Sequence, residues 1–209
     1  MLEKSRSERK TQNRVTSLFT DKKNPNWLGY DYLGDWSKNN NNNCIKTDLL
    51  RENLKKRGYS EQLISAALYK LKIATDVTGV TLYQANSRTY QLLRYGVSAQ
   101  ASIGTSHEQV HLIDWENPEN NDFGLAEEVT LRGGYERRPD IVLYINGIAV
   151  TVIELKRSSV DVAHGIRQLR TNQEKIFNEN FFPTIQLLFA GNDTQGLHYG
   201  TVTTPEKFF

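Results

Sequence analysis

Hydrophobic residues in the first half of the chain recur three or four positions apart, which is the spacing of amphipathic helices. The pattern predicts one helix that ends before Gly58, a second that begins after a capping serine at Ser60, and a third that ends at Gly96. A run of five asparagines at 39–43 precedes them and is too polar to pack, so we expect a mobile loop there. The apolar positions of the three helices are Ile45, Leu49, Leu50 and Leu54, then Ile64, Ala67, Leu68 and Leu71, then Tyr90 and Leu93.

In the second half the apolar period shortens to two, which is the pattern of strands with one face in the core. Four strands are predicted, over 110–114, 125–131, 141–145 and 149–155. A helix over 162–176 follows, and then two strands over 184–190 and 197–202. This order predicts a mixed α/β (α+β) fold, with a central mixed β-sheet flanked by helices and an N-terminal helical region.

The 209 residues are enough for one large domain. Because the first 26 residues are polar and basic, we expect a basic N-terminal arm or peripheral segment over 1–26 and one domain over 27–209. With 38% hydrophobic and 24% charged residues, the composition excludes wholesale disorder. No run of about 18 apolar residues occurs, so we expect no membrane contact. A single cysteine, Cys44, and the lack of a secretory signal favour the cytoplasm.

Two acidic residues and a lysine interrupt a predicted hairpin that is otherwise apolar. Glu154 and Lys156 are two positions apart, so their side chains point to the same face of one strand. Asp140 precedes the partner strand, and a plain two-residue turn at Asn146-Gly147 would place it on the opposite face. We therefore predict a three-residue loop over 145–147, which pairs 144 with 148 and 140 with 152, or a compensating bulge elsewhere in the hairpin.

Two carboxylates held a few ångströms apart repel each other, and a hard divalent cation relieves that repulsion. Mg²⁺ binds one or two protein carboxylates and keeps several waters, which leaves positions for a phosphate oxygen and an attacking hydroxide. A lysine beside it can hold or deprotonate the attacking water and offset charge in the transition state. The constellation predicts metal-assisted phosphodiester hydrolysis. The residues alone leave open a surface Glu-Lys pair next to an aspartate that caps a proline turn.

The flanks of the hairpin carry a local surplus of positive charge, although the formal net charge of the whole chain is only +2. Between 136 and 175, seven basic residues stand against five acidic ones, or three if Asp140 and Glu154 bind metal. Gln168 and Asn172 are four apart on the predicted helix, where their amides contact the metal water or the scissile phosphate, or else form a solvated face. The candidate DNA contacts in this surplus are Arg137, Arg138, Arg157, Arg167 and Arg170.

Other candidate sites are weaker. The four histidines have no carboxylate or cysteine at zinc-ligand spacing, so we expect no zinc site. Glu127 and Glu128 offer a third carboxylate, but a solvated strand edge is the simpler interpretation, and Glu52 is a similarly weak accessory acid. The chain has no G-x-x-x-x-G-K-[ST] motif, so we expect no ATP binding of that kind.

The hairpin and the helix after it resemble a known nuclease family. The segments RRPDIVLYINGIAVTVIELKRSS at 137–159 and GIRQLRTNQ at 165–173 are similar to the nuclease region of the restriction (R, motor) subunit of type I restriction-modification enzymes. That region belongs to the PD-(D/E)xK superfamily, so the resemblance implies a restriction-endonuclease-like core. Further similar stretches are LLRYGV at 92–97, LIDWENPENNDF at 112–123, AEEVTL at 126–131 and FFPTIQLLFAGNDTQGLHYGT at 181–201.

The resemblance assigns roles to individual residues. It implies that Asp140 and Glu154 bind the metal, with Leu155 in the same metal-binding set, and that Lys156 is the catalytic lysine. Gln168 matches the glutamine of the family's Q-x-x-x-Y motif and joins the catalytic set. The tyrosine position of that motif is Asn172 here, so this sequence departs from the family pattern and the phosphate contact proposed there is in doubt.

The function implied is that of a type I site-specific deoxyribonuclease, in its Mg²⁺-dependent endonuclease part, which cuts double-stranded DNA without base-specific readout. In such prokaryotic enzymes, ATP serves separate motor domains, and methyltransferase and specificity subunits are the partners. This chain ends before any ATPase motif, so we expect the N-terminal nuclease domain of an R subunit. Two alternatives remain: a DNA-binding or subunit-docking module on the same fold that is inactive in isolation, and a self-contained repair or junction-resolving nuclease.

Overall fold

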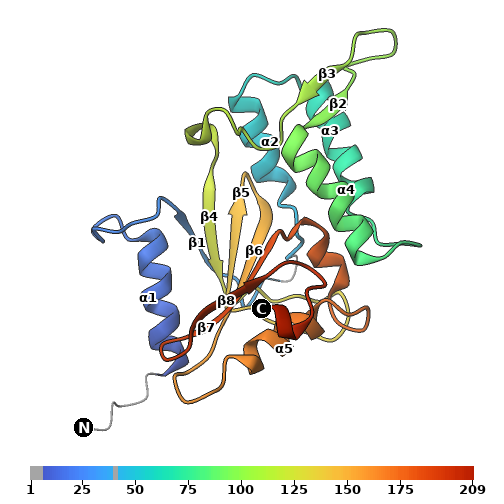
Figure 1. The fold of residues 1–209 in the computed structure, drawn as a ribbon. Coiled ribbons are helices and arrows are strands. Elements are labelled where there is room, and N and C mark those ends of the chain that lie inside the picture. Colours follow the sequence, from blue (N-terminus) through green and yellow to red (C-terminus); the bar gives the residue numbers. More distant parts are fainter. Residues whose placement is uncertain (1–6, 40–41) are drawn as a thin grey trace.

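A six-stranded sheet forms the centre of the molecule in the computed structural model, which describes residues 7–39 and 42–209 (Figure 1). The order across the sheet is β1 (Asp31–Asp35), β4 (Phe123–Glu127), β5 (Ile141–Ile145), β6 (Ile148–Leu155), β7 (Leu187–Asn192) and β8 (Gly196–Gly200). β1 runs parallel to β4 and β6 runs parallel to β7, whereas the other neighbours are antiparallel. The sheet is therefore mixed.

Helices cover both faces of this sheet. On one face, Val15 and Phe19 of α1 (Glu8–Thr20) pack against a cluster that includes Ile141, Ile153 and Leu155. The other face is covered by α5 (Ala163–Asn172) and the 3₁₀ helix η2 (Glu179–Thr184). The site residues of the β5–β6 hairpin thus lie between a helix from the N-terminus and a helix from the second half of the chain.

A helical group lies beside the sheet and has its own core (Figure 1). It consists of α2 (Thr47–Lys56), α3 (Glu61–Ala74) and α4 (Leu82–Tyr95), with a small hairpin of β2 (Val97–Ala99) and β3 (Glu108–Val110). Two short 3₁₀ helices, η1 (Pro118–Asn120) and η3 (Glu206–Phe208), complete the described elements. Ile148 and Val150 of β6 join this core, so the helical group is continuous with the sheet rather than a separate unit.

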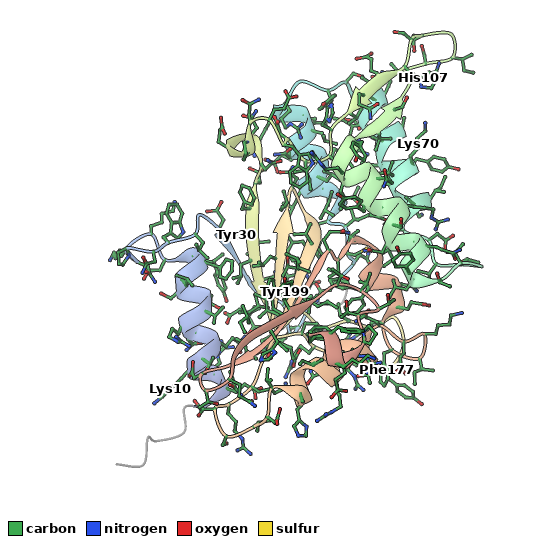
Figure 2. All side chains as sticks on the ribbon, viewed as in Figure 1. Lys10, Tyr30, Lys70, His107, Phe177 and Tyr199 are labelled. Carbon is green, nitrogen blue, oxygen red and sulfur yellow. The ribbon has the colours of Figure 1, made fainter. Side chains whose placement is uncertain are left out.

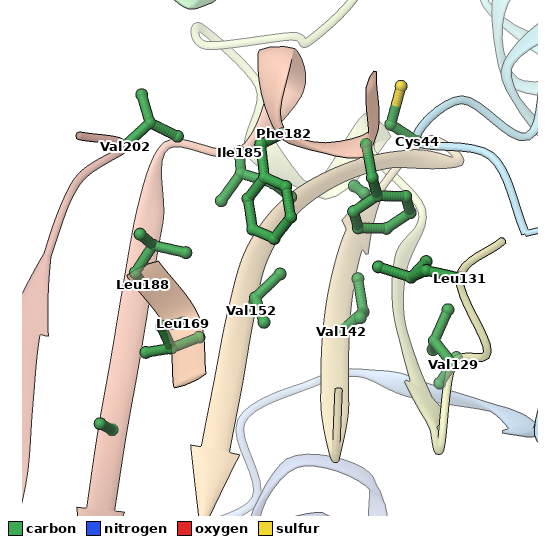
Figure 3. Packing of buried hydrophobic residues seen from close by; sticks show 14 of the residues in the cluster. Cys44, Val129, Leu131, Val142, Val152, Leu169, Phe182, Ile185, Leu188 and Val202 are labelled. Atoms are coloured by element: carbon green, nitrogen blue, oxygen red, sulfur yellow. The ribbon is translucent and has the colours of Figure 1, made fainter. Parts of the chain in front are cut away.

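The core beneath α5 fixes that helix against the hairpin. Leu169 of α5 and Phe182 of η2 lie over Val142, Val152 and Leu188 of three neighbouring strands (Figure 3). All five side chains are completely buried, and burying large apolar side chains is the main favourable contribution to folding. This packing sets the distance between α5 and β6, the elements that carry Gln168 and Glu154.

The predicted fold class is confirmed: a mixed α/β domain with a central mixed sheet flanked by helices, as a PD-(D/E)xK-like core requires. The three early helices are present, and the Ser60 side chain caps α3 by accepting the Leu63 N–H at 3.3 Å. Four predicted elements run past the observed ends, which are Val110, Glu127, Asn172 and Gly200, and the strand predicted over 184–190 begins only at Leu187. The strand predicted over 110–114 overlaps β3 at Val110 alone. β4 stops because Glu128 adopts a left-handed φ of 52°, which no regular strand accommodates.

The register of the β5–β6 hairpin differs from the first of the two predicted solutions. Ile145 pairs with Ile148, so the loop is the plain two-residue turn Asn146-Gly147, with φ values of 52° and 80°. The predicted three-residue loop is therefore wrong. A bulge follows instead, because Tyr144 pairs with Ala149 while Leu143 pairs with Thr151. This compensating bulge, the second predicted solution, is confirmed, and beyond it β5 and β6 are in the register that the site requires.

The N-terminal segment contributes to the packing of the domain. Within 1–26, which we expected as a basic arm or peripheral segment, residues 8–20 form α1 on the sheet. The asparagine run is also more structured than expected at one position: Asn42 is buried and donates to the carbonyl oxygens of Trp36, Asn39 and Thr130. Residues 40 and 41 of that run lie outside the described residues. No helix in the described part of the chain has the length and apolar character needed to cross a bilayer.

Candidate active site

The bulged hairpin brings Asp140, Glu154 and Lys156 together. Ile141 pairs with Ile153, so Asp140, one residue earlier, stands opposite Glu154 on the neighbouring strand. Lys156 directly follows β6, and its Nζ lies 2.8 Å from Glu154 Oε1, as expected for side chains two positions apart along an extended chain. The geometric condition that the sequence sets for an active site, both acids on one face of the sheet, is met.

Asp140 lies where two backbone segments meet. Its Oδ2 accepts the Leu155 N–H at 2.6 Å, and its main-chain oxygen accepts the Glu128 N–H at 2.9 Å. The residue is 8% exposed. Burial raises the pKa of the Asp140 carboxyl to about 6, although the Leu155 N–H and the Lys156 charge lower it. Asp140 is thus a rigidly held acid for which ionisation is unfavourable.

Glu154 is buried even more deeply, at 1% exposure. Burial first, and then the charge of Asp140, raise the pKa of Glu154 to about 8, even though Lys156 acts in the opposite direction. Its Oε1 accepts a hydrogen bond from Lys156, whereas its buried Oε2 has no hydrogen-bond partner among the described residues. A buried carboxylate oxygen without a partner is costly, and it marks a position where a cation would be stabilising.

Lys156 is held between the acid and the downstream helix. Its Nζ donates to Glu154 Oε1 at 2.8 Å and to Gln168 Oε1 of α5 at 2.9 Å. Burial disfavours the ammonium form, but the neighbouring carboxylates, Glu154 foremost, outweigh burial and raise the pKa of Lys156. Gln168, singled out on helical spacing, therefore positions the lysine. The structure brings four sequence-predicted residues into one site.

This oxygen-rich site fits a hard divalent cation. Two carboxylates with raised pKa values and one unpartnered oxygen form an environment that favours added positive charge, and oxygen is the donor that Mg²⁺ prefers. Within the described residues, no third histidine, cysteine, aspartate or glutamate completes a cluster of three ligands. That arrangement matches the coordination habit of Mg²⁺, which usually takes one or two carboxylates and retains water.

Comparison with known proteins identifies the family. The model of the type I restriction enzyme R protein N terminus (HSDR_N) matches residues 6–207. The chain belongs to this family. The HindI endonuclease subunit of Haemophilus influenzae is 29% identical over 166 residues, which are 71% of this chain and 16% of the relative. A putative MjaVIIIP endonuclease subunit of Methanocaldococcus jannaschii is 32% identical over 139 residues, 64% of this chain and 13% of the relative. The chain therefore spans only a small part of the length of these endonuclease subunits.

Four of the five candidate DNA-contact arginines of this R-protein domain have partners in the structure. Arg138 pairs with Glu128 at 2.9 Å, while Arg167 and Arg170 share Glu206 at 2.9 and 3.7 Å. Arg137 stacks over the Phe177 ring, which Figure 2 labels beyond the end of α5, at 3.9 Å from its centroid. Arg157 is exposed directly after Lys156, and no carboxylate of the described residues lies within ion-pair distance.

Asn172 does not share the site with Gln168. It is completely buried, and neither its Oδ1 nor its Nδ2 has a hydrogen-bond partner in the described part of the domain. Burial excludes the DNA contact predicted for this residue. Helical spacing alone could not reveal this, because a residue four positions along a helix is rotated by about 40°, enough here to move the side chain from the site into the core.

Sequence reasoning missed two residues behind the site. Glu128 was weighed as part of a solvated edge, yet its carboxylate binds Gln12, Arg9 and Arg138, and Glu127 beside it is 4% exposed. The simpler interpretation of a solvated edge is therefore wrong. Gln12 lies in a segment expected to be peripheral, and its role depends on the docking of α1, which no local pattern reveals.

Proposed function

We propose that this R-protein domain is a Mg²⁺-dependent endonuclease that hydrolyses phosphodiester bonds of double-stranded DNA. The observation that carries the proposal is the convergence of Asp140, Glu154 and Lys156 on one face of a bulged hairpin. One carboxylate oxygen among them has no partner within residues 7–39 and 42–209. In a purely structural ion pair we would expect both carboxylate oxygens to have partners, because buried polar groups normally do.

Asp140, Glu154 and the main-chain oxygen of Leu155 would hold Mg²⁺ in this proposal. The ion supplies a Lewis acid for the scissile phosphate and a means of activating water. An ammonium has three N–H donors, of which Lys156 uses two, on Glu154 and Gln168. The third is available to hold the attacking water or a phosphate oxygen, and the charge of Lys156 offsets the negative charge that develops in the transition state.

Recognition of DNA in this proposal rests on the backbone rather than on base sequence. The exposed cations near the site are arginines on α5 and on the segments that flank the hairpin, and arginines suit phosphate oxygens. Binding of this kind is electrostatic and falls steeply with salt concentration.

The biological setting follows from the relatives. These are named as endonuclease subunits of type I restriction enzymes. We infer that this domain acts within a longer R subunit, together with methyltransferase and specificity subunits in a prokaryotic cytoplasm. ATP would serve only motor domains outside this chain.

Metal titration of this 209-residue chain tests the proposal. Wild type, Asp140→Asn and Lys156→Met variants are compared for Mg²⁺ binding by calorimetry and for nicking of plasmid DNA. We expect wild type to bind Mg²⁺, Asp140→Asn to lose binding, and Lys156→Met to bind Mg²⁺ but cleave at least 100-fold more slowly, in keeping with the size of general acid–base and electrostatic effects. If wild type neither binds Mg²⁺ nor cleaves better than both variants, a docking or DNA-binding module is the better description.

A further inference from the structure

The N-terminal helix α1 reaches the back of the candidate active site through a single buried amide. Gln12 is 2% exposed, and its Nε2 donates to the main-chain oxygen of Asp140 at 3.2 Å and to Glu128 Oε1 at 3.1 Å. Its side chain therefore spans the gap between a helix near the start of the chain and the strand pair that carries the acids. Most buried polar side chains make their hydrogen bonds, and Gln12 makes two through Nε2.

The main-chain oxygen of Asp140 is held from two directions. The Glu128 N–H donates to it at 2.9 Å, and Gln12 donates to it from α1. On the side-chain end, Oδ2 accepts the Leu155 N–H at 2.6 Å. Asp140 is not part of the β5 ladder, since that strand begins at Ile141. Its position therefore depends on these three hydrogen bonds in addition to the pairing of its neighbour Ile141.

Glu128 supplies its N–H from a strained backbone. Its φ of 52° is uncommon for a residue with a side chain, and such conformations persist only when the surroundings enforce them. The Glu128 carboxylate is fixed by Gln12, by Arg138 at 2.9 Å and by Arg9 at 3.3 Å. Gln12 is the one residue of these three that also contacts Asp140, so it couples the strained turn to the acid.

The rest of α1 is anchored elsewhere, which separates docking of the helix from contact with the site. Thr11 Oγ1 donates to Asp193 at 2.9 Å, in the turn between β7 and β8. At the far end of the helix, Phe19 packs edge-on against Tyr30, which lies between α1 and the sheet (Figure 2). The helix would therefore stay docked without Gln12.

We propose that Gln12 is a positioning residue of the active site, which fixes the metal-binding acid Asp140 through its main-chain oxygen and through the Glu128 turn. The inference deepens the proposed nuclease function and rests on it for its consequence in metal binding. The placement of Asp140, however, is a property of the metal-free fold. Partners that orient metal ligands typically change metal affinity or activity by about 10- to 100-fold when they are removed.

Two near-isosteric variants of the 209-residue chain test the proposal. Gln12→Met keeps the volume and removes both hydrogen bonds, whereas Thr11→Val removes an equally buried hydrogen bond of α1 that does not reach the site. Amide hydrogen exchange is measured by NMR without metal, and Mg²⁺ affinity is measured by calorimetry. We expect Gln12→Met to speed exchange of the Leu155 and Glu128 amides about 10-fold relative to amides of β7 and β8, and to weaken Mg²⁺ binding about 10-fold. Thr11→Val should do neither.

The outcomes separate the two proposals. Unchanged relative exchange at Leu155 and Glu128 in Gln12→Met, or the same change in Thr11→Val, would reduce Gln12 to an ordinary docking contact and overturn the inference. If exchange responds selectively but wild type binds no Mg²⁺, the positioning of Asp140 by Gln12 stands and the metal-dependent function fails. If Gln12→Met changes both the amide exchange and the Mg²⁺ affinity while Thr11→Val changes neither, both proposals are supported.

Discussion

Asp140 and Glu154 are two acids whose ionisation the folded metal-free protein disfavours. For such groups the folded state binds protons that the unfolded state has already released, so stability falls as pH rises from the unfolded pKa to the folded one. With folded values of about 6 for Asp140 and about 8 for Glu154, the window runs from about pH 4 to about pH 8. Above that window the loss is complete and stays constant. Both acids therefore couple the stability of the metal-free protein to pH.

We predict that the unfolding free energy of the metal-free protein decreases by about 2–4 kcal/mol between pH 5 and pH 8, less than a full conversion of the shifts because relaxation and water penetration reduce the cost of a buried charge. Urea denaturation in EDTA measures it. Glu154→Gln should flatten the curve above about pH 6, since only the shift of Asp140 remains. Saturating Mg²⁺ should restore stability at pH 8, because binding requires ionised acids and favours the folded state. A rise in stability over this pH range would contradict the burial of both acids.

At the residue scale, most residues of the candidate site could be predicted from the sequence, but the residues that hold them in place could not. Glu154, Lys156 and Gln168 were predicted because strand and helix periodicity place side chains on faces without any knowledge of the fold. Asp140 was predicted to join them only on condition of a bulge. Gln12 was not predicted, because its partners lie more than 100 residues away in the sequence and a lone polar residue gives no periodic signal.

The register of the β5–β6 hairpin could be narrowed to two solutions from the sequence, but the choice between them could not be made. A bulged loop and a plain turn followed by a bulge both place Asp140 and Glu154 on the same face of the sheet. The choice depends on tertiary contacts of the turn: Asn146 is buried, and its side chain bonds to Leu112, Asn121 and the Asp122 N–H. The bulge, the turn and the long-range contacts of Asn146 therefore form one structural solution.

Gly147 provides a test of that turn. It has a φ of 80°, and a Cβ there would lie 2.7 Å from Leu49 Cβ and 2.8 Å from the Lys46 oxygen. We predict that Gly147→Ala destabilises the domain by about 3 kcal/mol, from left-handed strain and from steric overlap. Gly79→Ala is the matched control, since its φ is 73° but its Cβ would meet nothing within 4 Å. Chemical denaturation that shows equal losses in both variants would mean that overlap with α2 contributes nothing.

The docking of α1 gives a second prediction at the scale of elements. Phe19 is half-buried against the sheet, with its ring centroid 5.0 Å from that of Tyr30. Phe19→Ala should lower the unfolding free energy by about 2 kcal/mol, below the ~3–5 kcal/mol typical of a fully buried phenylalanine. Asn13→Ala, on the exposed face of the same helix, should change it by less than about 0.5 kcal/mol. Equal stability of the two variants by urea denaturation would show α1 to be a dispensable appendage.

Across the whole molecule, the two parallel strand pairs of the sheet, β1 with β4 and β6 with β7, could not be predicted from the sequence. β1 was not predicted because Asp31–Asp35 is short, contains a glycine and has an aspartate at each end, and its pairing with β4 joins residues about 90 positions apart. The order of helices and strands along the chain could be predicted because it depends on local periodicity, whereas the pairing of strands depends on the packing of the assembled sheet. The same limit applies to charge, since local counts of basic residues do not show which of them are paired.

Glu206 pairs with two basic residues that the sequence counts as free positive charge, and this pairing leads to a prediction about DNA binding. Its carboxylate lies 2.9 Å from Arg167 and 3.7 Å from Arg170, on the helix that holds Gln168 beside Lys156. Exposed pairs of this kind contribute little to stability, but they lower the positive potential that a phosphate backbone meets. We predict that Glu206→Gln tightens binding to non-specific duplex DNA about 3-fold at low salt and that the gain shrinks as salt is added.

Glu119→Gln provides the control for that experiment, because it makes the same change in net charge at an exposed acid on η1. Fluorescence anisotropy with a labelled duplex at several salt concentrations measures both variants. If α5 lies along the DNA path, only Glu206→Gln should gain affinity, because the interaction between exposed charges is screened beyond about 10 Å at 0.1 M salt. Equal gains in the two variants would attribute the effect to net charge alone and would place the DNA elsewhere on the surface.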